Sequence, residues 1–298
     1  MLVEETLLKL TTPFYAAIIG GEMLFSAWGH RHFYSVKETV TNVYLTLLNA
    51  GLDIALRFVF TLPILLFFYN MHIVQFANPW VYWTLLFVTE DFAYYWLHRN
   101  DHQSRFFWAT HVTHHSSEEY NLTTGFRSSV FQPLYRFLYF IPIVLLGFDP
   151  ADLFLMYSIT QIYGILVHTQ SIKKMGFLEH ILITPSHHRV HHASNIPYLD
   201  KNLGMCLIVW DKLFGTFEPE DIEKHGPTIY GLTKPLDDRG AVNIVAHEWK
   251  DIWKDWTRND LTFRQKFAYT FNPPGWSHDG SMQTSPELQK EYWENIQK

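Results

Sequence analysis

The chain has 298 residues, of which 48% are apolar and 17% aromatic, and its formal net charge is −6. The negative charge and the lack of a concentrated basic face exclude nucleic acid as an expected partner. The single cysteine, Cys206, excludes an internal disulfide, and its apolar neighbours in the sequence predict a packing role. Glu4 and Glu5 stand where a basic leader would be, so no cleavable signal peptide is expected.

Five apolar segments in the first 170 residues are candidates for membrane-spanning helices, each of which needs about 20 mostly apolar residues. They cover residues 13–28, 43–69, 80–97, 130–148 and 151–170. Glu22 interrupts the first segment, and Asp53 and Arg57 lie within the second. We therefore expect an all-α integral membrane bundle with about four or five spans. Alternatively, the first two segments form re-entrant or interfacial helices.

Basic and non-basic loops alternate along this half of the chain. Lys and Arg occur in residues 29–42 and 98–129 but are absent from residues 70–79. Basic loops are retained on the cytoplasmic side of a membrane. The pattern predicts transmembrane helices over residues 1–170, with 98–129 as a cytoplasmic loop, and a histidine-rich cytoplasmic cap over residues 171–298.

Nine of the seventeen histidines fall into three tight clusters. Side chains at positions i, i+3 and i+4 of a helix lie on neighbouring parts of its surface, and neutral imidazole is the commonest metal ligand in proteins. Eight imidazoles at such spacings suit two metal ions better than one. The eight are His98, His102, His111, His114, His115, His188, His191 and His192. His168 stands alone, as a ninth ligand or as a capping group, and His187 receives no role.

Several polar residues near the clusters are candidates for orienting a ligand histidine. Polar groups inside apolar helices are usually functional, and carboxylates commonly accept the free ring N–H of a ligand histidine. The candidates are Asp91, Glu118, Asn121, Asp200 and Asp211. Glu118 and Asn121 are also candidates for contacting a lipid headgroup. Glu90 is an equal candidate for this role and for a hydrogen bond between two helices.

The remaining motifs, present and absent, limit the classes of reaction to be expected. No nucleotide-binding glycine motif and no HExxH motif occurs, so redox chemistry needs a separate electron donor, and a zinc protease is not expected. Residues 245–256 have the pattern of an amphipathic helix with a tryptophan-rich face. Such a helix lies on the bilayer or packs against the rest of the cap.

The clusters and their order resemble the fatty acid hydroxylase/sterol desaturase superfamily of membrane di-iron oxygenases, and within it the alkylglycerol monooxygenase branch with its bacterial members. The resemblance covers about residues 80–275 and is most specific at residues 113–121, 184–192 and 210–217. It implies two irons held by the motif histidines, a catalytic unit over about residues 80–220, and O₂, a lipid and an external electron donor such as a reduced pterin. The family's Asn-Tyr-Gly is here Asn-Leu-Gly, so a tyrosine role is absent or moved to Tyr198.

The resemblance implies an integral membrane monooxygenase that hydroxylates a lipid C–H bond on the cytoplasmic side, with cleavage of alkylglycerol ethers as one outcome. A sterol or carotenoid hydroxylase or desaturase is the alternative within the superfamily. A membrane zinc transporter or metal sensor is the alternative from another class, and a catalytically dead relative is a third reading. A lipid chain is expected to enter between the spans. The aromatic residues expected to line that slot, or to form an interfacial belt, are Tyr94, Tyr95, Trp96, Phe106, Phe107 and Trp108.

Overall fold

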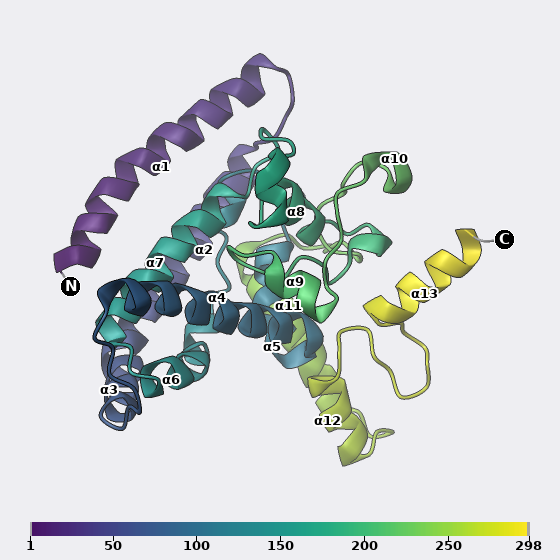
Figure 1. The fold of residues 1–298 in the computed structure, drawn as a ribbon. Coiled ribbons are helices and arrows are strands. Elements are labelled where there is room, and N and C mark those ends of the chain that lie inside the picture. Colours follow the sequence, from purple (N-terminus) through teal and green to yellow (C-terminus); the bar gives the residue numbers. More distant parts are fainter. Residues whose placement is uncertain (1, 297–298) are drawn as a thin grey trace.

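The computed structural model describes residues 2–296, and helices dominate it (Figure 1). The helices are α1 (Leu2–Trp28), α2 (Val36–Leu56), α3 (Leu62–Tyr69), α4 (Pro79–Gln103), α5 (Arg105–His115), α6 (Phe137–Leu145), α7 (Pro150–Leu166), α8 (Pro185–His191), α9 (Val209–Phe214), α10 (Ile222–His225), α11 (Ala241–Thr257), α12 (Phe263–Phe271) and α13 (Ser285–Ile296). Within residues 2–296 no strand forms, and only two isolated bridges join extended segments. The predicted all-α class is confirmed.

One continuous helical segment, Val36–Tyr69, is long and apolar enough to cross a membrane. It joins α2 to α3 through the π-helical turn η1 (Arg57–Thr61). Its 34 residues correspond to roughly 50 Å at about 1.5 Å per residue, well over the hydrocarbon thickness. Ser35 starts the segment by accepting a hydrogen bond from the Glu38 N–H. The predicted span 43–69 lies inside this helix.

The predicted span 130–148 is not one helix. Its helical part, α6, has only nine residues, or about 14 Å, which is less than half of the hydrocarbon thickness. The chain before it forms the short turn η3 (Gln132–Leu134), where Pro133 has no N–H to donate. Gly147, with φ of +110°, follows the end of α6. Pro133 and Gly147 therefore restrict the helix to the middle of this apolar segment.

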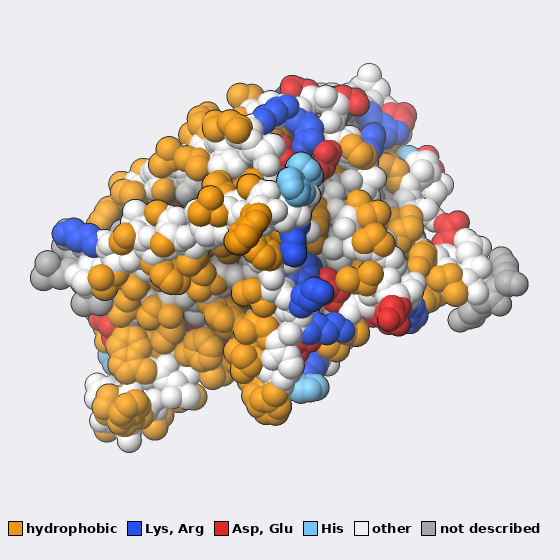
Figure 2. Space-filling view, turned by 90° about the horizontal axis from the view of Figure 1, so that it is seen from above, with side chains coloured by type: hydrophobic (Ala, Val, Ile, Leu, Met, Phe, Trp, Pro, Cys, Tyr) orange, Lys and Arg blue, Asp and Glu red, His pale blue; other side chains and the backbone are white. Residues whose placement is uncertain are grey.

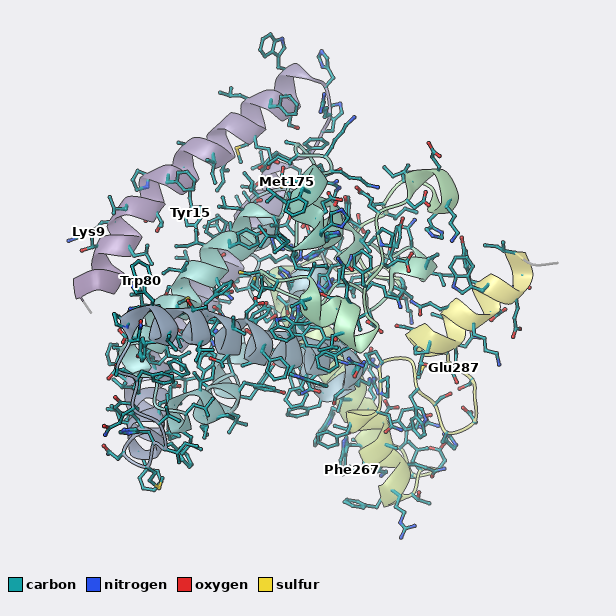
Figure 3. The ribbon with its side chains drawn as sticks, viewed as in Figure 1. Lys9, Tyr15, Trp80, Met175, Phe267 and Glu287 are labelled. Atoms are coloured by element: carbon teal, nitrogen blue, oxygen red, sulfur yellow. The ribbon has the colours of Figure 1, made fainter. Side chains whose placement is uncertain are left out.

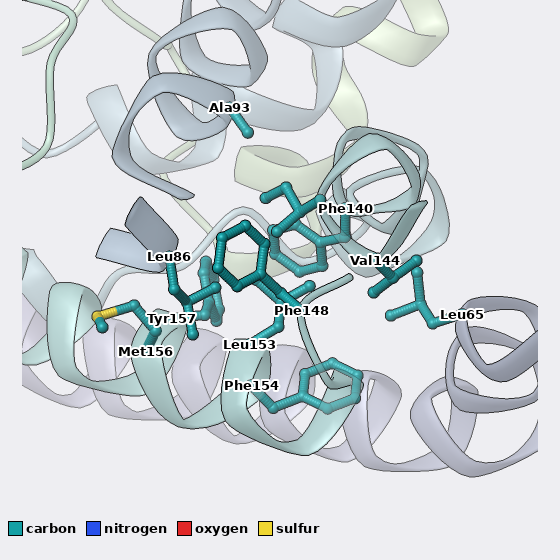
Figure 4. Close-up of a cluster of buried hydrophobic side chains, with 11 residues drawn as sticks. Leu65, Leu86, Ala93, Phe140, Val144, Phe148, Leu153, Phe154, Met156 and Tyr157 are labelled. Atoms are coloured by element: carbon teal, nitrogen blue, oxygen red, sulfur yellow. The ribbon is translucent and has the colours of Figure 1, made fainter. Parts of the chain in front are cut away.

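The main apolar core joins α3, α4, α6 and α7. It contains Leu65, Leu86, Phe140, Phe148, Leu153, Phe154 and Tyr157 among others (Figure 4). Two polar contacts reinforce the pairing of α4 with α7. The Tyr82 hydroxyl donates to Asp152, and the Thr160 hydroxyl donates to Glu90. This second bond is the helix–helix alternative that was open for Glu90. The core thus fixes the first half of α4 against α7, and the C-terminal ends of these two helices lead to His98, His102 and His168.

Large apolar side chains are exposed along the first four helices. Among them are Leu24 (74% exposed), Leu47 (67%) and Trp80 (83%). Figure 2 shows hydrophobic side chains spread over one part of the molecule, with most of the charged groups elsewhere. An extended exposed apolar surface marks a site of membrane or protein contact.

The C-terminal third packs around α5 and the end of α4. Arg105 at the start of α5 pairs with Glu248 and Asp255 of α11, and Phe106 packs edge to face on Trp249. The amphipathic α11 therefore uses one side to pack within the chain, as one of its two predicted roles requires. Cys206 is buried, in agreement with its predicted packing role.

Candidate metal centre

The nine predicted histidines converge into two groups. Within each group, one ligand atom from every member lies within 4.8 Å of those of all the others. The first group is His98, His102, His111, His115 and His191, and the second group is His114, His168, His188 and His192. All are buried except His114, which is half-buried. His187 belongs to neither group, because its ring accepts a bond from the Thr184 N–H and completes the cap of α8.

Helix periodicity explains how three clusters make two groups. His98 and His102 are one turn apart at the end of α4, as are His111 and His115 in α5 and His188 and His192 at the end of α8. Each of these pairs stays within one group. The odd members cross over, since His114 joins the second group and His191 joins the first. Helices α5 and α8 thus each contribute to both groups.

The nitrogen spacings fit shared metal ions. Two nitrogens about 2.1 Å from one ion, at angles of 90–109°, lie roughly 3.0–3.4 Å apart. The Nε2 atom of His111 lies 3.0 Å from that of His98 and 3.1 Å from that of His115. The Nε2 atom of His168 lies 3.0 Å from those of His188 and His192 and 3.3 Å from that of His114. The residues present therefore fit one ion in each group.

Two further atoms support this fit. The Nε2 atoms of His102 and His191 are buried and have no hydrogen-bond partner within the chain. A buried polar atom without a partner is costly, by about 1–3 kcal/mol. Coordination to an ion in the first group satisfies both atoms at once.

The electrostatics keep the imidazoles neutral. Burial lowers the pKa of His114 to about 4. Burial, followed by repulsion from neighbouring imidazoles, also lowers the pKa values well below 6.5 for His111, His115, His188, His191 and His192. A neutral imidazole has the lone pair that a metal ion requires. The site is therefore prepared for a cation at neutral pH.

Six of the nine rings are oriented through Nδ1, which leaves Nε2 directed at the group. Four Nδ1 atoms donate to backbone carbonyls: His98 to Leu203 (2.7 Å), His114 to Arg127 (2.8 Å), His168 to Gly164 (2.6 Å) and His191 to Lys201 (3.0 Å). His102 donates to Asp200 and His111 to Ser129, each at 3.0 Å. Such partners fix the tautomer and the direction of the ligand atom.

Of the predicted orienting residues, Asp200 contacts a histidine directly, through the bond to His102. Asp91 and Asp211 instead hold the neighbouring loop. Asp91 accepts bonds from two backbone N–H groups and the indole of segment 206–210, and Asp211 accepts from the N–H groups of residues 203 and 204. They position the Leu203 carbonyl that accepts a hydrogen bond from His98, so they orient His98 indirectly.

Glu118 and Asn121 do not orient a histidine, which was one of the two roles predicted for them, because neither bonds to a histidine. Glu118 is exposed and pairs with Arg239. The Asn121 amide donates to the Phe33 carbonyl, and its oxygen accepts from Thr123. Helix α5 ends at His115, and in the segment that follows it is Tyr120, between these two residues, whose ring packs on His168 and His192.

Asp101 is a site residue that sequence reasoning missed. Its carboxylate accepts hydrogen bonds from Gln132 (2.8 Å) and Tyr135 (2.6 Å) and approaches Nδ1 of His111 to 3.7 Å. Burial raises the pKa of Asp101 to about 7. Its position between the two histidines of the first cluster was the available signal. The backbone carbonyls that accept from the histidines could not be predicted in this way, because every residue carries a carbonyl.

A cavity of about 500 Å³ opens on the first group. His102, His115, His191 and His192 line its inner end, and Trp108, Leu199 and Leu236 form an apolar wall; its outer part contains Lys234, Asp237, Lys250, Asp251 and Lys254. Of the six aromatic residues expected to line a slot between the spans, Trp108 lines this cavity. The cavity is bounded by α11 and the C-terminal segments, so it approaches the histidines from the side of the cap.

The fold and these two groups define a helical protein with a histidine-rich candidate metal site and a membrane-compatible helix. Residues 83–216 match the family model for fatty acid hydroxylase. The chain is 40% identical over 209 residues to human alkylglycerol monooxygenase (70% of this chain, 45% of that one) and 37% identical over 282 residues to the Xenopus tropicalis enzyme of that name (92% and 60%). It is 31% identical over 178 residues to ornithine lipid hydroxylase OlsE of Rhizobium tropici (55% and 53%).

The match of residues 83–216 to the fatty acid hydroxylase model and the similarity to these relatives confirm the predicted resemblance. It spans about half the length of the curated relatives that it matches. No solved structure matches it significantly.

Proposed function

We propose that this chain is a membrane-bound, O₂-dependent lipid monooxygenase in which each histidine group holds one iron. The observation that carries the proposal is the division of nine buried histidines into two groups with nitrogen spacings suited to one ion each. Relatives named as a monooxygenase and as a lipid hydroxylase support the reaction class.

The choice of metal comes from the family rather than from the ligands, since imidazole suits iron, copper and zinc alike. When bound, the pair of irons supplies the activation of dioxygen that attack on an unactivated C–H bond requires. The chain's own part is to hold neutral imidazoles in place through their Nδ1 bonds and to keep the groups buried. Electrons come from a separate donor, and a reduced pterin is the candidate that we test.

For the substrate we propose an alkylglycerol ether lipid. Relatives named alkylglycerol monooxygenase match the chain at 31–40% identity over most of the chain's length. Hydroxylation of the carbon beside the ether oxygen inserts one atom of O₂ into the C–H bond, and the other oxygen atom leaves as water after taking up two electrons from the donor and two protons. The resulting hemiacetal breaks down to an aldehyde and a glycerol. A sterol substrate is the alternative, because lathosterol oxidase matches at 28% identity.

For the topology we propose four or five crossings over residues 1–170, with α2–α3 as the best supported, and a cytoplasmic cap over residues 171–298. The catalytic unit covers about residues 80–220. Basic residues after the metal-bearing ends of α4 and α7 favour the cytoplasmic side for the histidine groups. The lipid then reaches the groups from the bilayer, and the cavity on the cap side gives O₂ and the donor an aqueous route.

The test is reconstitution of the purified chain in lipid nanodiscs, with metal analysis and product detection by mass spectrometry. We expect about two irons per chain, one for each group, and a fatty aldehyde from an alkylglycerol given O₂ and a reduced pterin. Conversion of a sterol alone selects the alternative substrate. Reversible zinc binding without iron or turnover refutes the proposal and favours a transporter or sensor.

The ligand assignment is tested separately. Replacing His102, His114 or His191 by Ala is expected to abolish turnover and reduce iron loading. His225 is the matched control, because it is a half-buried histidine whose ring nitrogens are buried without a hydrogen-bond partner, and it belongs to neither group. Full activity in any of the three group variants contradicts the assignment.

A further inference from the structure

A second apolar surface lies outside the predicted membrane-spanning segments of residues 1–170. After α7 the chain forms the short turn η4 (Gly176–His180), and α9 lies next to it. Phe177 is 72% exposed and Leu213 is 65% exposed. Other exposed apolar side chains join them. The η4–α9 surface consists of Ile172, Met175, Phe177, Leu178, Ile181, Val209 and Leu213.

The two segments form one continuous surface. The Ile183 N–H donates to the Cys206 carbonyl (2.8 Å), and the Ile208 N–H donates to the Ile181 carbonyl (3.1 Å). The Lys212 ammonium donates to the carbonyl of His180 at the end of η4. These bonds hold η4 and α9 side by side. The apolar groups are therefore a fixed feature of the fold rather than a loose loop.

The η4–α9 surface adjoins the exposed side of α4. The Trp210 indole donates to Asp91 (2.9 Å), and its ring packs on Phe92 with centroids 4.9 Å apart. Phe92 is itself 37% exposed. It precedes His98 by six residues, which is about 9 Å along the helix. The surface therefore meets α4 close to the level of the first histidine group, and Met175 lies beyond the C-terminal end of α7 (Figure 3).

Basic groups border this surface. Lys173, Lys174 and Lys212 are exposed beside it. The acidic group of η4, Glu179, accepts hydrogen bonds from Ser186 and from the Met175 N–H, so it is turned toward the protein. Exposed aromatic and aliphatic groups flanked by lysines are the composition of segments that lie in the headgroup zone of a bilayer.

We propose that the η4–α9 surface lies in the headgroup zone of the bilayer that α2–α3 crosses, with Phe177 and Leu213 dipping below the phosphates and the lysines contacting them. This inference rests on the membrane topology given in the proposed function. Continuity with α4 and the basic border favour a lipid surface over a protein partner. The lipid contact sets the depth of the first group, because Asp211 in α9 holds the loop whose Leu203 carbonyl accepts from His98.

Site-directed fluorescence tests the proposal in the full chain. Cys206 is buried, so a cysteine introduced at an exposed position is the reactive one. Phe177→Cys and Leu213→Cys carry an environment-sensitive label in nanodiscs of phosphatidylcholine and phosphatidylglycerol. Ile222→Cys is the matched control, because Ile222 is 55% exposed on α10, which lies on the opposite side of the molecule from α3 (Figure 1).

We expect nitroxide lipids to quench the labels at 177 and 213, at a depth of roughly 5–10 Å into the headgroup and acyl boundary. The label at 222 is expected to be quenched by aqueous iodide instead. Iodide quenching at 177 and 213 equal to that at 222 overturns the proposal and leaves the surface for a protein partner. A Lys173→Glu, Lys174→Glu variant supplies a second measurement, with shallower quenching expected at 177.

Iron content and turnover measured on the same samples separate this inference from the proposed function. Labels in the headgroup zone of a chain without iron or turnover refute the proposed function alone. Labels in water on a chain with both refute the η4–α9 proposal alone. Folding is monitored by the thermal melt of each labelled variant, and Met175→Cys replaces any variant that fails to fold.

Discussion

Asp200 gives the sharpest test of how the first group is oriented. Its carboxylate accepts from Nδ1 of His102 at 3.0 Å, and its side chain is 31% exposed. Its φ of +56° lies in the left-handed region, which Gly and Asn tolerate and Ala does not. Asp200→Gly therefore removes the acceptor without backbone strain. Asp200→Asn removes the charge and keeps an acceptor oxygen.

The expected magnitudes follow from that contact. A hydrogen bond to a charged group contributes about 1.5–3 kcal/mol, and the partial exposure of Asp200 favours the lower end. At 1.4 kcal/mol for each factor of ten, Asp200→Gly weakens iron binding in the first group by about tenfold. Asp200→Asn keeps a neutral bond, roughly half as strong, and is expected to lose about threefold.

The assay is iron titration against a competing chelator in nanodiscs, with turnover measured in parallel. Asp237→Asn is the control, because Asp237 lines the same cavity and belongs to neither histidine group. It removes the same charge and is expected to leave iron affinity unchanged. Equal losses in Asp237→Asn and Asp200→Asn would show that cavity charge, not the bond to His102, controls the affinity. An unchanged Asp200→Gly variant would refute the orienting role.

Three further predictions follow from the site. His191→Ala is expected to cost about one of the two irons by metal analysis, whereas His225→Ala retains both, since only His191 belongs to a group. Arg127→Met removes one of the two arginines that pair with the buried Glu38 carboxylate and leaves Arg239 as the other. It is expected to destabilise the fold by about 3 kcal/mol, the lower end of the cost of breaking a buried pair, measured as a lower thermal midpoint that Glu38→Gln partly restores. The iron-free chain is expected to lose stability as pH falls from about 6.5 toward 4. His114 has a folded pKa of about 4, below its unfolded value, so in that window the unfolded state binds the extra proton. A flat profile of the thermal midpoint over these pH values contradicts this.

The sequence was sufficient for the identity of the eight clustered histidines and for their convergence, because residue type and helical spacing carry that information; it left the role of His168 open. It did not predict how they divide into two groups. A helix turns 100° per residue, so His114 and His115 point in different directions although they are neighbours. That rotation sends His114 to the second group, whereas His111 and His115 remain together. The same effect separates His191 from its cluster.

The features that were not predictable depend on contacts between distant parts of the chain. His98 donates to the carbonyl of Leu203, which is 105 residues away, and no residue type marks such an acceptor. Hydropathy likewise treated residues 130–148 as one segment, whereas Pro133 and Gly147 limit its helix to nine residues. Asp200 was identified because a carboxylate is a visible signal. Glu118 and Asn121 gave similar signals, but Glu118 pairs with Arg239, and Asn121 bonds to Phe33 and Thr123 instead of to a histidine.

The position of the cavity predicts that the two proposed irons leave at different rates. Three of its lining residues, His102, His115 and His191, belong to the first group, and only His192 belongs to the second. A bulky water-soluble chelator therefore reaches the first group through the cavity. The second group is covered, since the Tyr120 ring packs on both His168 and His192.

We expect chelation to proceed in two phases of about one iron each, with the fast phase belonging to the first group. Asp200→Gly should accelerate the fast phase alone, because it loosens His102 and touches nothing in the second group. The control is a small chelator that enters both groups, for which the two rates should approach each other. A single phase with the bulky chelator, or an Asp200→Gly variant that accelerates both phases equally, would mean that the cavity is not the route by which solutes reach the metal.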